Sequence, residues 1–389
     1  MIFDTIIDRK NTCCDKWDYL ERYYGEKDML GLWVADMDFA VPQAITDAIV
    51  QRAAHPIYGY TETDEGYYDA MIAWYKKRHD YSIEKDWIVY GPGVIPVICF
   101  LIQAFSEEGD KVIIQEPVYH PFKKSILSNH RVPLINELVY DGESYYMDLE
   151  ALERQIDERT KLMILCSPHN PVGRVWSKEE LTAVGNLCIR HNIMLIADEI
   201  HGDIVYPGYK HIPFASISEE FADHSVLCNA PNKSFNIAGL QGCNVIIKNP
   251  EIRAKYLEYI DKFHMAEFTP ISMVAHQAAY AYGEEWFDEL LVYLEGNIQF
   301  TVKYLAEHLP SVKVIRPEAT YMLWLDFRGT GFSMDEINAR LIKKAKVALN
   351  DGYMFGESGA GFQRMNIACP KKIIEQALER IASAFRETA

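Results

Sequence analysis

Apolar, strand-like runs alternate with amphipathic helical stretches between about residues 87 and 250, and this alternation constrains the fold most. A short apolar run bounded by turn residues predicts a buried strand. The stretch 178–191 is typical of the helices between them, because Ser177 precedes it as a cap and Glu180 follows three residues later. The alternation predicts a mostly parallel sheet that helices cover on both faces. The expected strands are residues 87–90, 111–115, 131–135, 162–166, 193–197, 226–229 and 244–247.

The chain length and a change of pattern near residue 284 predict two domains. A chain of 389 residues exceeds what a single hydrophobic core usually supports. After residue 284 the pattern becomes a long helical stretch at 284–309, a strand at 321–327 and a mixed tail. We therefore expect a large α/β domain with a seven-stranded sheet at residues 45–284, and a smaller α+β domain built from residues 1–44 and 285–389.

Three short motifs follow expected strands: SPHNPVGR at 167–174, ADEIH at 197–201 and NKSFNIAGL at 232–240. Open α/β sheets bind ligands at the carboxyl ends of their strands, and Asp198 and Lys233 are both placed there. A buried carboxylate needs a partner, and a desolvated lysine beside a cationic ring can act as nucleophile and then as base. Asn170, Asp198 and Lys233 thus supply partners for the ring hydroxyl, the ring nitrogen and the aldehyde of pyridoxal phosphate, which we predict as the cofactor.

Two further features predict contacts to the same cofactor. The strand at 87–90 runs into the segment Gly91-Pro92-Gly93-Val94-Ile95-Pro96 and then into an apolar, helix-like run. Free backbone amides and the helix dipole make such a helix start an anion site, here for the cofactor phosphate. Tyr119 follows the strand at 111–115 and brings an aromatic ring to the same edge. Taken singly, these features are ordinary turn and packing residues, and their position ahead of the three motifs supports the interpretation.

Charge and cysteine content exclude several other classes. The formal net charge of -17 argues against nucleic acid or an anionic membrane as partner, because both require clustered positive charge. We find no secretory signal and no apolar run of membrane-spanning length, and we expect a cytoplasmic protein. The eight cysteines are spread along the chain as in proteins of a reducing compartment, and we expect neither a structural metal nor a metal site.

Six strings resemble the class I/II aminotransferase superfamily with the pyridoxal-phosphate-dependent fold type I, over nearly the whole chain. Within it, they are similar to the MalY/PatB-type cystathionine beta-lyases, a branch of carbon-sulfur lyases. The WVADMDF start and the DEIH string are the most specific to this branch. The strings are LWVADMDF at 32–39, IYGYT at 57–61, VYGP at 89–92, DEIH at 198–201, KSFNI at 233–237 and FQRMN at 362–366.

The resemblance implies a role for each matching position. Lys233 would form the Schiff base with the cofactor and move the alpha proton of the substrate. Arg364 would bind the substrate carboxylate through paired N–H donors, a geometry that lysine cannot copy. Tyr60 would reach the phosphate of the neighbouring subunit, which implies a homodimer with a shared active site. Further implied cofactor contacts are Val94, Ile95, Tyr119, Asn170, Asp198, His201 and Asn232, and further implied substrate contacts are Val34 and Asn170; Tyr119 and Asp198 join Lys233 as catalytic groups.

Two positions depart from the pattern of the aspartate aminotransferases. Those enzymes hold the phosphate with a serine three residues before the lysine and an arginine eight residues after it. This chain has Ala230 and Gln241 there. The phosphate thereby loses one hydroxyl and one charged partner, which leaves Asn232 and backbone amides to compensate.

The residues leave the reaction open between two outcomes. After Lys233 removes the alpha proton, a thiolate can leave the beta carbon to give pyruvate and ammonia, or a proton can return elsewhere to give transamination. The branch-specific strings favour beta-elimination on cystathionine, cystine or another cysteine conjugate. The alternative is an aminotransferase acting on an aromatic or hydrophobic amino acid. A third hypothesis, from another class, is a regulatory protein that keeps the enzyme site, although the sequence marks no docking patch.

Overall fold

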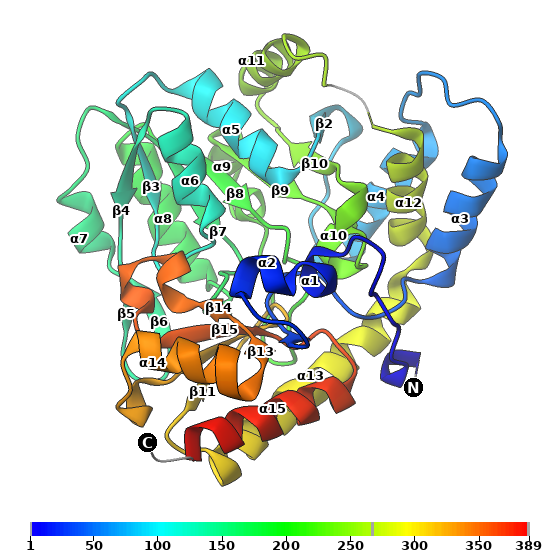
Figure 1. Ribbon diagram of the computed structural model, residues 1–389. Helices are drawn as coiled ribbons and strands as arrows, with labels where there is room; N and C mark the ends of the chain where they lie inside the picture. Colours follow the sequence, from blue (N-terminus) through cyan, green and yellow to red (C-terminus); the bar gives the residue numbers. More distant parts are fainter. Residues whose placement is uncertain (1, 266–267, 387–389) are drawn as a thin grey trace.

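The computed structural model describes residues 2–265 and 268–386, and its centre is a seven-stranded sheet (Figure 1). The strand order is β2-β10-β9-β8-β7-β3-β4. Each strand expected from the sequence has a counterpart, with small shifts at its ends, so the predicted mostly parallel sheet is confirmed. The strands are β2 (Ile88–Gly91), β3 (Lys111–Ile114), β4 (Val132–Ile135), β7 (Thr160–Cys166), β8 (Met194–Asp198), β9 (Ser225–Asn229) and β10 (Cys243–Ile246).

Five neighbouring strands of this sheet run parallel, in the order β9-β8-β7-β3-β4, whereas β10 is antiparallel to both of its neighbours, β2 and β9. Their side chains alternate between two cores, because successive residues of a strand point to opposite faces. Leu162 and Ile164 of β7 belong to the core with helices α5 (Val94–Phe105), α6 (Pro121–Ser128) and α11 (Pro250–Asp261). Met163 and Leu165 belong to the opposite core.

Helices on that second face complete the layers. They include α4 (Glu65–His79), α8 (Lys178–Arg190), α9 (Glu219–Asp223) and α12 (Pro270–Tyr282). The expected cap of α8 is present: the Ser177 hydroxyl accepts from the Glu180 backbone amide, and the Glu180 carboxylate accepts from the Ser177 amide. Such reciprocal bonds satisfy two amides that would otherwise lack partners at the start of the helix.

A second, antiparallel sheet lies in the C-terminal part of the chain, in the order β11-β12-β15-β14. Residues before 44 join this region, since β1 pairs in parallel with β13. The division into domains at residues 45 and 284 stays a prediction. The elements here are β1 (Leu30–Gly31), β11 (Lys313–Ile315), β12 (Met322–Asp326), β13 (Val347–Ala348), β14 (Asn350–Asp351), β15 (Phe362–Asn366), α13 (Glu284–His308), α14 (Met334–Ala339) and α15 (Lys371–Arg386).

The remaining elements are short, apart from α3 (Gln43–Ala54), which packs against α12. They are α1 (Asp15–Asp18), α2 (Leu20–Tyr24), α7 (Leu149–Glu153), α10 (Pro231–Ser234), β5 (Leu138–Tyr140) and β6 (Tyr145–Met147). In the described part of the chain, no helix is both long and apolar enough to cross a membrane. Within residues 2–265 and 268–386, no group of three or more His, Cys, Asp or Glu side chains is arranged to hold a metal ion.

Candidate active site

A cavity of about 170 Å³ opens at the carboxyl ends of the central strands and collects most of the predicted site residues. Cys166 and Asp198, the last residues of β7 and β8, form part of its wall. The predicted residues in its lining are Val94, Ile95, Tyr119, Asn170, Asp198, His201, Asn232 and Lys233, and they come from segments that lie far apart in the sequence. The topology therefore joins the three motifs with the helix start and the aromatic ring, as the sequence predicts.

Asp198 is a buried carboxylate whose side chain has few hydrogen-bond partners among the described residues. It is 5% exposed, and its Oδ1 accepts one hydrogen bond, from the Ile200 amide at 3.1 Å. Burial raises the pKa of Asp198 to about 7, against the smaller opposing effects of that hydrogen bond and of the Lys233 charge. A carboxylate in this state favours a cationic partner within the cavity.

Lys233 lies in the short helix α10, which follows β9 and directs the lysine into the cavity. Its Nζ donates to the Ala35 carbonyl at 2.6 Å. Burial lowers the pKa of Lys233 to about 8, and the charge of Arg364 acts in the same direction, while Asp36 and Asp198 oppose both. A lysine with such a pKa carries a substantial neutral fraction near neutral pH and can serve as nucleophile and base.

The start of α5 lines the cavity and has the features of an anion site. Gly93 precedes the helix with a φ of 156°, a conformation that favours glycine, and the helix begins at Val94. Val94 and Ile95, in the first turn of the helix, line the same cavity as Asn232. The Asn232 side chain donates to the Gly242 carbonyl at 3.0 Å, and its buried Oδ1 lacks a partner among the described residues.

Arg364 stands at the edge of this cavity as a buried cation without an acidic partner among the described residues. It is 3% exposed and lies on β15, far from the cofactor motifs in sequence. Its Nη1 donates to Asn170 Oδ1 at 3.1 Å, and its Nη2 donates to Asn350 Oδ1 at 2.6 Å and to the Trp33 carbonyl at 3.1 Å. Burial lowers the pKa of Arg364 to about 10. Its Nε has no hydrogen-bond partner within residues 2–265 and 268–386. This arrangement suits a carboxylate ligand.

His201 and Tyr119 add two rings to the cavity wall. His201 is buried, and its Nδ1 lacks a partner among the described residues. Burial lowers the pKa of His201 to about 3, and the charges of Lys233 and Arg364 add to the effect, so the imidazole is neutral near pH 7. The Tyr119 ring packs edge-on against Phe122 and lines the cavity on one side.

Other predicted positions lie outside the cavity. Tyr60 is fully exposed and lines a separate depression with Phe268. Val34 is not part of the cavity wall, and the structure shows its carbonyl accepting from the Asn366 side chain at 2.6 Å. Gln241 is exposed, whereas Ala230 is buried in the core beneath the site. The role of each site residue stays a prediction.

Ala35, Tyr321 and Asn350 are among the residues at the site that the sequence does not predict. The Ala35 carbonyl accepts from Lys233 and also from the Tyr321 hydroxyl at 2.9 Å, and Asn350 holds Arg364. Ala35 lies within the LWVADMDF string, which was a usable signal. Tyr321 and Asn350 carry no local motif, since only the folding of the C-terminal sheet brings them here.

Pyridoxal phosphate fits the chemistry of the groups that line this cavity. The Asp198 carboxylate matches a protonated ring nitrogen, the amides at the start of α5 match a phosphate, and Lys233 matches an aldehyde. Asn170 and His201 lie on the wall where they can reach a ring oxygen. Because position 241 holds a glutamine and not an arginine, the helix amides and Asn232 are the groups in this part of the chain that could hold a phosphate.

Comparison with known proteins places this site within a family. Residues 27–381 match the family model described as aminotransferase class I and II. The chain belongs to that family. Its members depend on pyridoxal phosphate, and the fold is the type I fold of these enzymes, as the sequence predicts.

Relatives narrow the position of this aminotransferase-family chain to the MalY/PatB branch. It is 42% identical to the cystathionine beta-lyase PatB of Bacillus subtilis, over 99% of this chain and 100% of the relative. It is 35% identical to the protein MalY of Escherichia coli, over 99% and 98% of the two chains. The crystal structure of the pyridoxal-phosphate-bound C-S lyase from Staphylococcus hominis superposes with a TM-score of 0.92 at 34% identity, over 99% and 98%.

Proposed function

We propose that this chain is a pyridoxal-phosphate-dependent carbon-sulfur beta-lyase. Its substrates would be cystathionine, cystine or related cysteine conjugates, and its products a thiol, pyruvate and ammonia. The observation that carries the proposal is Arg364, a buried cation with no acidic partner among the described residues, beside the cavity of Lys233 and Asp198. The relatives that this chain resembles include a cystathionine beta-lyase and a C-S lyase.

Each side chain has a distinct task in this reaction. Arg364 binds the substrate carboxylate and thereby turns the alpha carbon toward Lys233. The bound cofactor supplies an electron sink for the pair released at the alpha carbon. Asp198 keeps the charge on the ring nitrogen, because a buried carboxylate stabilises an adjacent cation. Tyr119 limits movement of the ring from one side.

Lys233 moves the proton in this mechanism. As a neutral amine it removes the alpha proton, after which the bond between the beta carbon and sulfur breaks and sulfur leaves with the electron pair. The three-carbon product keeps the amino nitrogen until water hydrolyses it to pyruvate and ammonia. The pKa of Lys233 near 8 keeps a usable fraction of the amine neutral at the pH of turnover.

A pyruvate assay tests the proposal. Purified holoenzyme mixed with L-cystathionine should release pyruvate, followed through the coupled oxidation of NADH by lactate dehydrogenase, and a Lys233→Ala variant should release none. No pyruvate from L-cystathionine or cystine, together with rapid amino transfer to 2-oxoglutarate, would refute the lyase and establish the aminotransferase.

We further propose a homodimer that shares its active site. Helices α3 and α12 lie side by side at one edge of the molecule (Figure 1), and a cavity of about 520 Å³ runs between them. Exposed apolar side chains gather on these helices and the following loop, which is unusual for a monomer surface. They are Val50, Ile57, Tyr58, Tyr60 and Tyr282. Sedimentation velocity should give a dimer, and Tyr282→Asp should weaken it.

The compartment we propose is the cytoplasm. All eight cysteines are free thiols, and five of them are buried. Free buried thiols are typical of proteins that fold under reducing conditions.

A further inference from the structure

Residues 33–39, here called the strap, cross the site without regular secondary structure and offer their carbonyl groups to side chains. Asn366 donates to the Val34 and Asp36 carbonyls, both at 2.6 Å. Asn236 donates to the Met37 and Phe39 carbonyls at 3.0 and 2.8 Å, and its Oδ1 accepts from the Met37 amide. No strand or helix fixes this segment. These side chains set its position together with a backbone bond, in which the Asp38 amide donates to the Ala368 carbonyl at 2.9 Å.

The strap also binds both cations of the site. The Ala35 carbonyl accepts from Lys233 at 2.6 Å, and the Trp33 carbonyl accepts from Arg364 at 3.1 Å. The amine that would move the alpha proton and the guanidinium that would bind the substrate are therefore placed by the same short segment. A displacement of the strap changes the location of both groups together.

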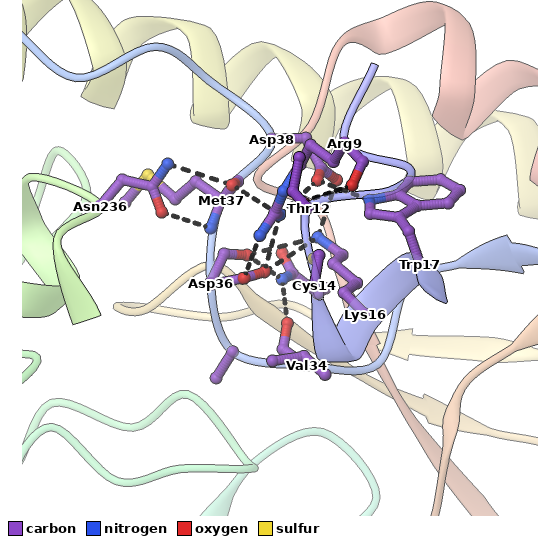
Figure 2. Close-up of polar contacts among 12 residues, drawn as sticks. Arg9, Thr12, Cys14, Lys16, Trp17, Val34, Asp36, Met37, Asp38 and Asn236 are labelled. Atoms are coloured by element: carbon purple, nitrogen blue, oxygen red, sulfur yellow. Dashed lines mark hydrogen bonds and ion pairs between the residues drawn. The ribbon is translucent and has the colours of Figure 1, made fainter. Parts of the chain in front are cut away.

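The two carboxylates of the strap, Asp36 and Asp38, form a network of zero net charge with two cations, Arg9 and Lys16 (Figure 2). Lys16 is fully buried, and its Nζ lies 2.7 Å from Asp38 Oδ2 and 3.5 Å from Asp36 Oδ1. Arg9 contacts both oxygens of Asp36, at 3.2 and 2.6 Å, and Asp38 Oδ1 at 2.7 Å. The Trp17 indole N–H also donates to Asp38 Oδ1, at 2.9 Å.

The same two cations contact the strap backbone directly. Lys16 Nζ donates to the Asp36 carbonyl at 3.3 Å, and Arg9 Nη1 donates to the Met37 carbonyl at 3.1 Å. Lys16 and Asp38 are removed from water and Arg9 and Asp36 are partly exposed. Burying the Lys16–Asp38 pair is costly, and the mutual attraction of the charges offsets that cost only in good geometry. Such a network contributes little to net stability, but it fixes one arrangement of the segment that carries it, because each displaced charge would be left unpaired.

We propose that Arg9, Lys16, Asp36 and Asp38 are positioning residues for the reaction: they lock the strap so that the Ala35 carbonyl places the Lys233 amine and the Trp33 carbonyl places Arg364. The inference rests on the proposed role of Lys233 in moving the alpha proton. None of the four network side chains lines the cavity itself, so they act through the strap, and the charge of Asp36 in addition raises the pKa of Lys233.

The experiment compares Arg9→Met, Arg9→Lys and the double variant Lys16→Met with Asp38→Asn, which removes the buried pair without leaving a charge. The rate of amide hydrogen exchange in the strap of the apoenzyme should rise about tenfold or more in Arg9→Met and in the double variant, because local opening of the strap becomes easier. The holoenzyme is then assayed for exchange of the alpha hydrogen of L-alanine with D₂O by NMR, per bound cofactor. That rate should fall about tenfold or more, because the amine is misplaced.

L-Alanine has no leaving group on its beta carbon, so this assay is independent of the lyase proposal. Arg9→Lys should lie between wild type and Arg9→Met, since lysine cannot contact both oxygens of Asp36. Arg131→Met is the matched control: Arg131 is a buried cation that donates to Ser106 and to the Asn129 carbonyl, away from the strap. It should lower the melting temperature while strap exchange and alanine exchange stay near wild type.

Three results would overturn the proposal. One is unchanged strap exchange in both Arg9→Met and the double variant. Another is faster strap exchange with alanine exchange within about twofold of wild type. The third is a loss of alanine exchange in Arg131→Met equal to that in Arg9→Met, which would show that general destabilisation is responsible.

Discussion

Asp198 should make the apoenzyme less stable than an isosteric neutral variant, and the difference should grow with pH. Its pKa is raised from 3.8 to about 7 by burial. Between these values the folded chain binds more protons at this site than the unfolded chain, so the free energy of unfolding falls as pH rises. Each pKa unit corresponds to about 1.4 kcal/mol. The Asp198→Asn apoenzyme should therefore be more stable than wild type by up to about 4 kcal/mol at pH 8, and by about 1.5 kcal/mol at pH 5.

Asp203 provides the matched control, because it is a second buried aspartate with the opposite environment. Burial tends to raise its pKa, but the hydrogen bonds and charge of His79, with the hydrogen bonds of Ser234 and Trp74, lower it overall. The ionised form thus stabilises the fold above the unfolded pKa, and this stabilisation is lost only as pH falls through the lower folded value. Asp203→Asn should be less stable than wild type at pH 5 and at pH 8, by about 3 kcal/mol.

Urea unfolding of the three apoenzymes at one protein concentration and at both pH values measures these differences. Saturating cofactor should narrow or reverse the advantage of Asp198→Asn, because only the wild-type carboxylate pairs with a protonated ring nitrogen. The reasoning is wrong if the Asp198→Asn apoenzyme is no more stable than wild type at pH 8, or if its advantage is the same at pH 5 and pH 8.

Other substitutions test individual contacts. Arg364→Lys should raise KM for L-cystathionine about tenfold or more with a smaller change in kcat, because lysine cannot form paired N–H contacts to a carboxylate. Steady-state pyruvate release measures both constants, and an unchanged KM would contradict the role of Arg364 in binding the substrate carboxylate. Lys233→Ala should still bind the cofactor but lose its covalent absorbance band, seen by spectrophotometric titration of the apoenzyme; a retained band would place the covalent bond on another lysine. Tyr119→Leu should speed cofactor dissociation by about threefold to tenfold because it removes ring stacking, whereas Tyr119→Phe keeps the ring and should leave the rate unchanged. Equal cofactor dissociation rates in the two variants would exclude stacking by this ring.

The sequence was sufficient for the central sheet and for most of the residues that line the cavity. Strand periodicity is local information, and parallel topology brings the carboxyl ends of strands to one edge. Asn170, Asp198 and Lys233 could therefore be assigned to one pocket before any coordinates, with Tyr119 and the helix start at Val94 beside them. Arg364 needed the family resemblance, because an arginine within a strand has no local mark of function.

Tertiary structure alone decided how the reactive groups are held. Lys233 and Arg364 donate to the carbonyls of Ala35 and Trp33. Because every residue has the same backbone carbonyl, no sequence pattern predicts these two contacts. The burial of Lys16 against Asp38 likewise depends on the packing of α1 against the strap. Chain chemistry thus determined which cofactor this protein uses, whereas long-range packing determined where the amine and the guanidinium stand, because position arises from contacts between segments that are distant in sequence.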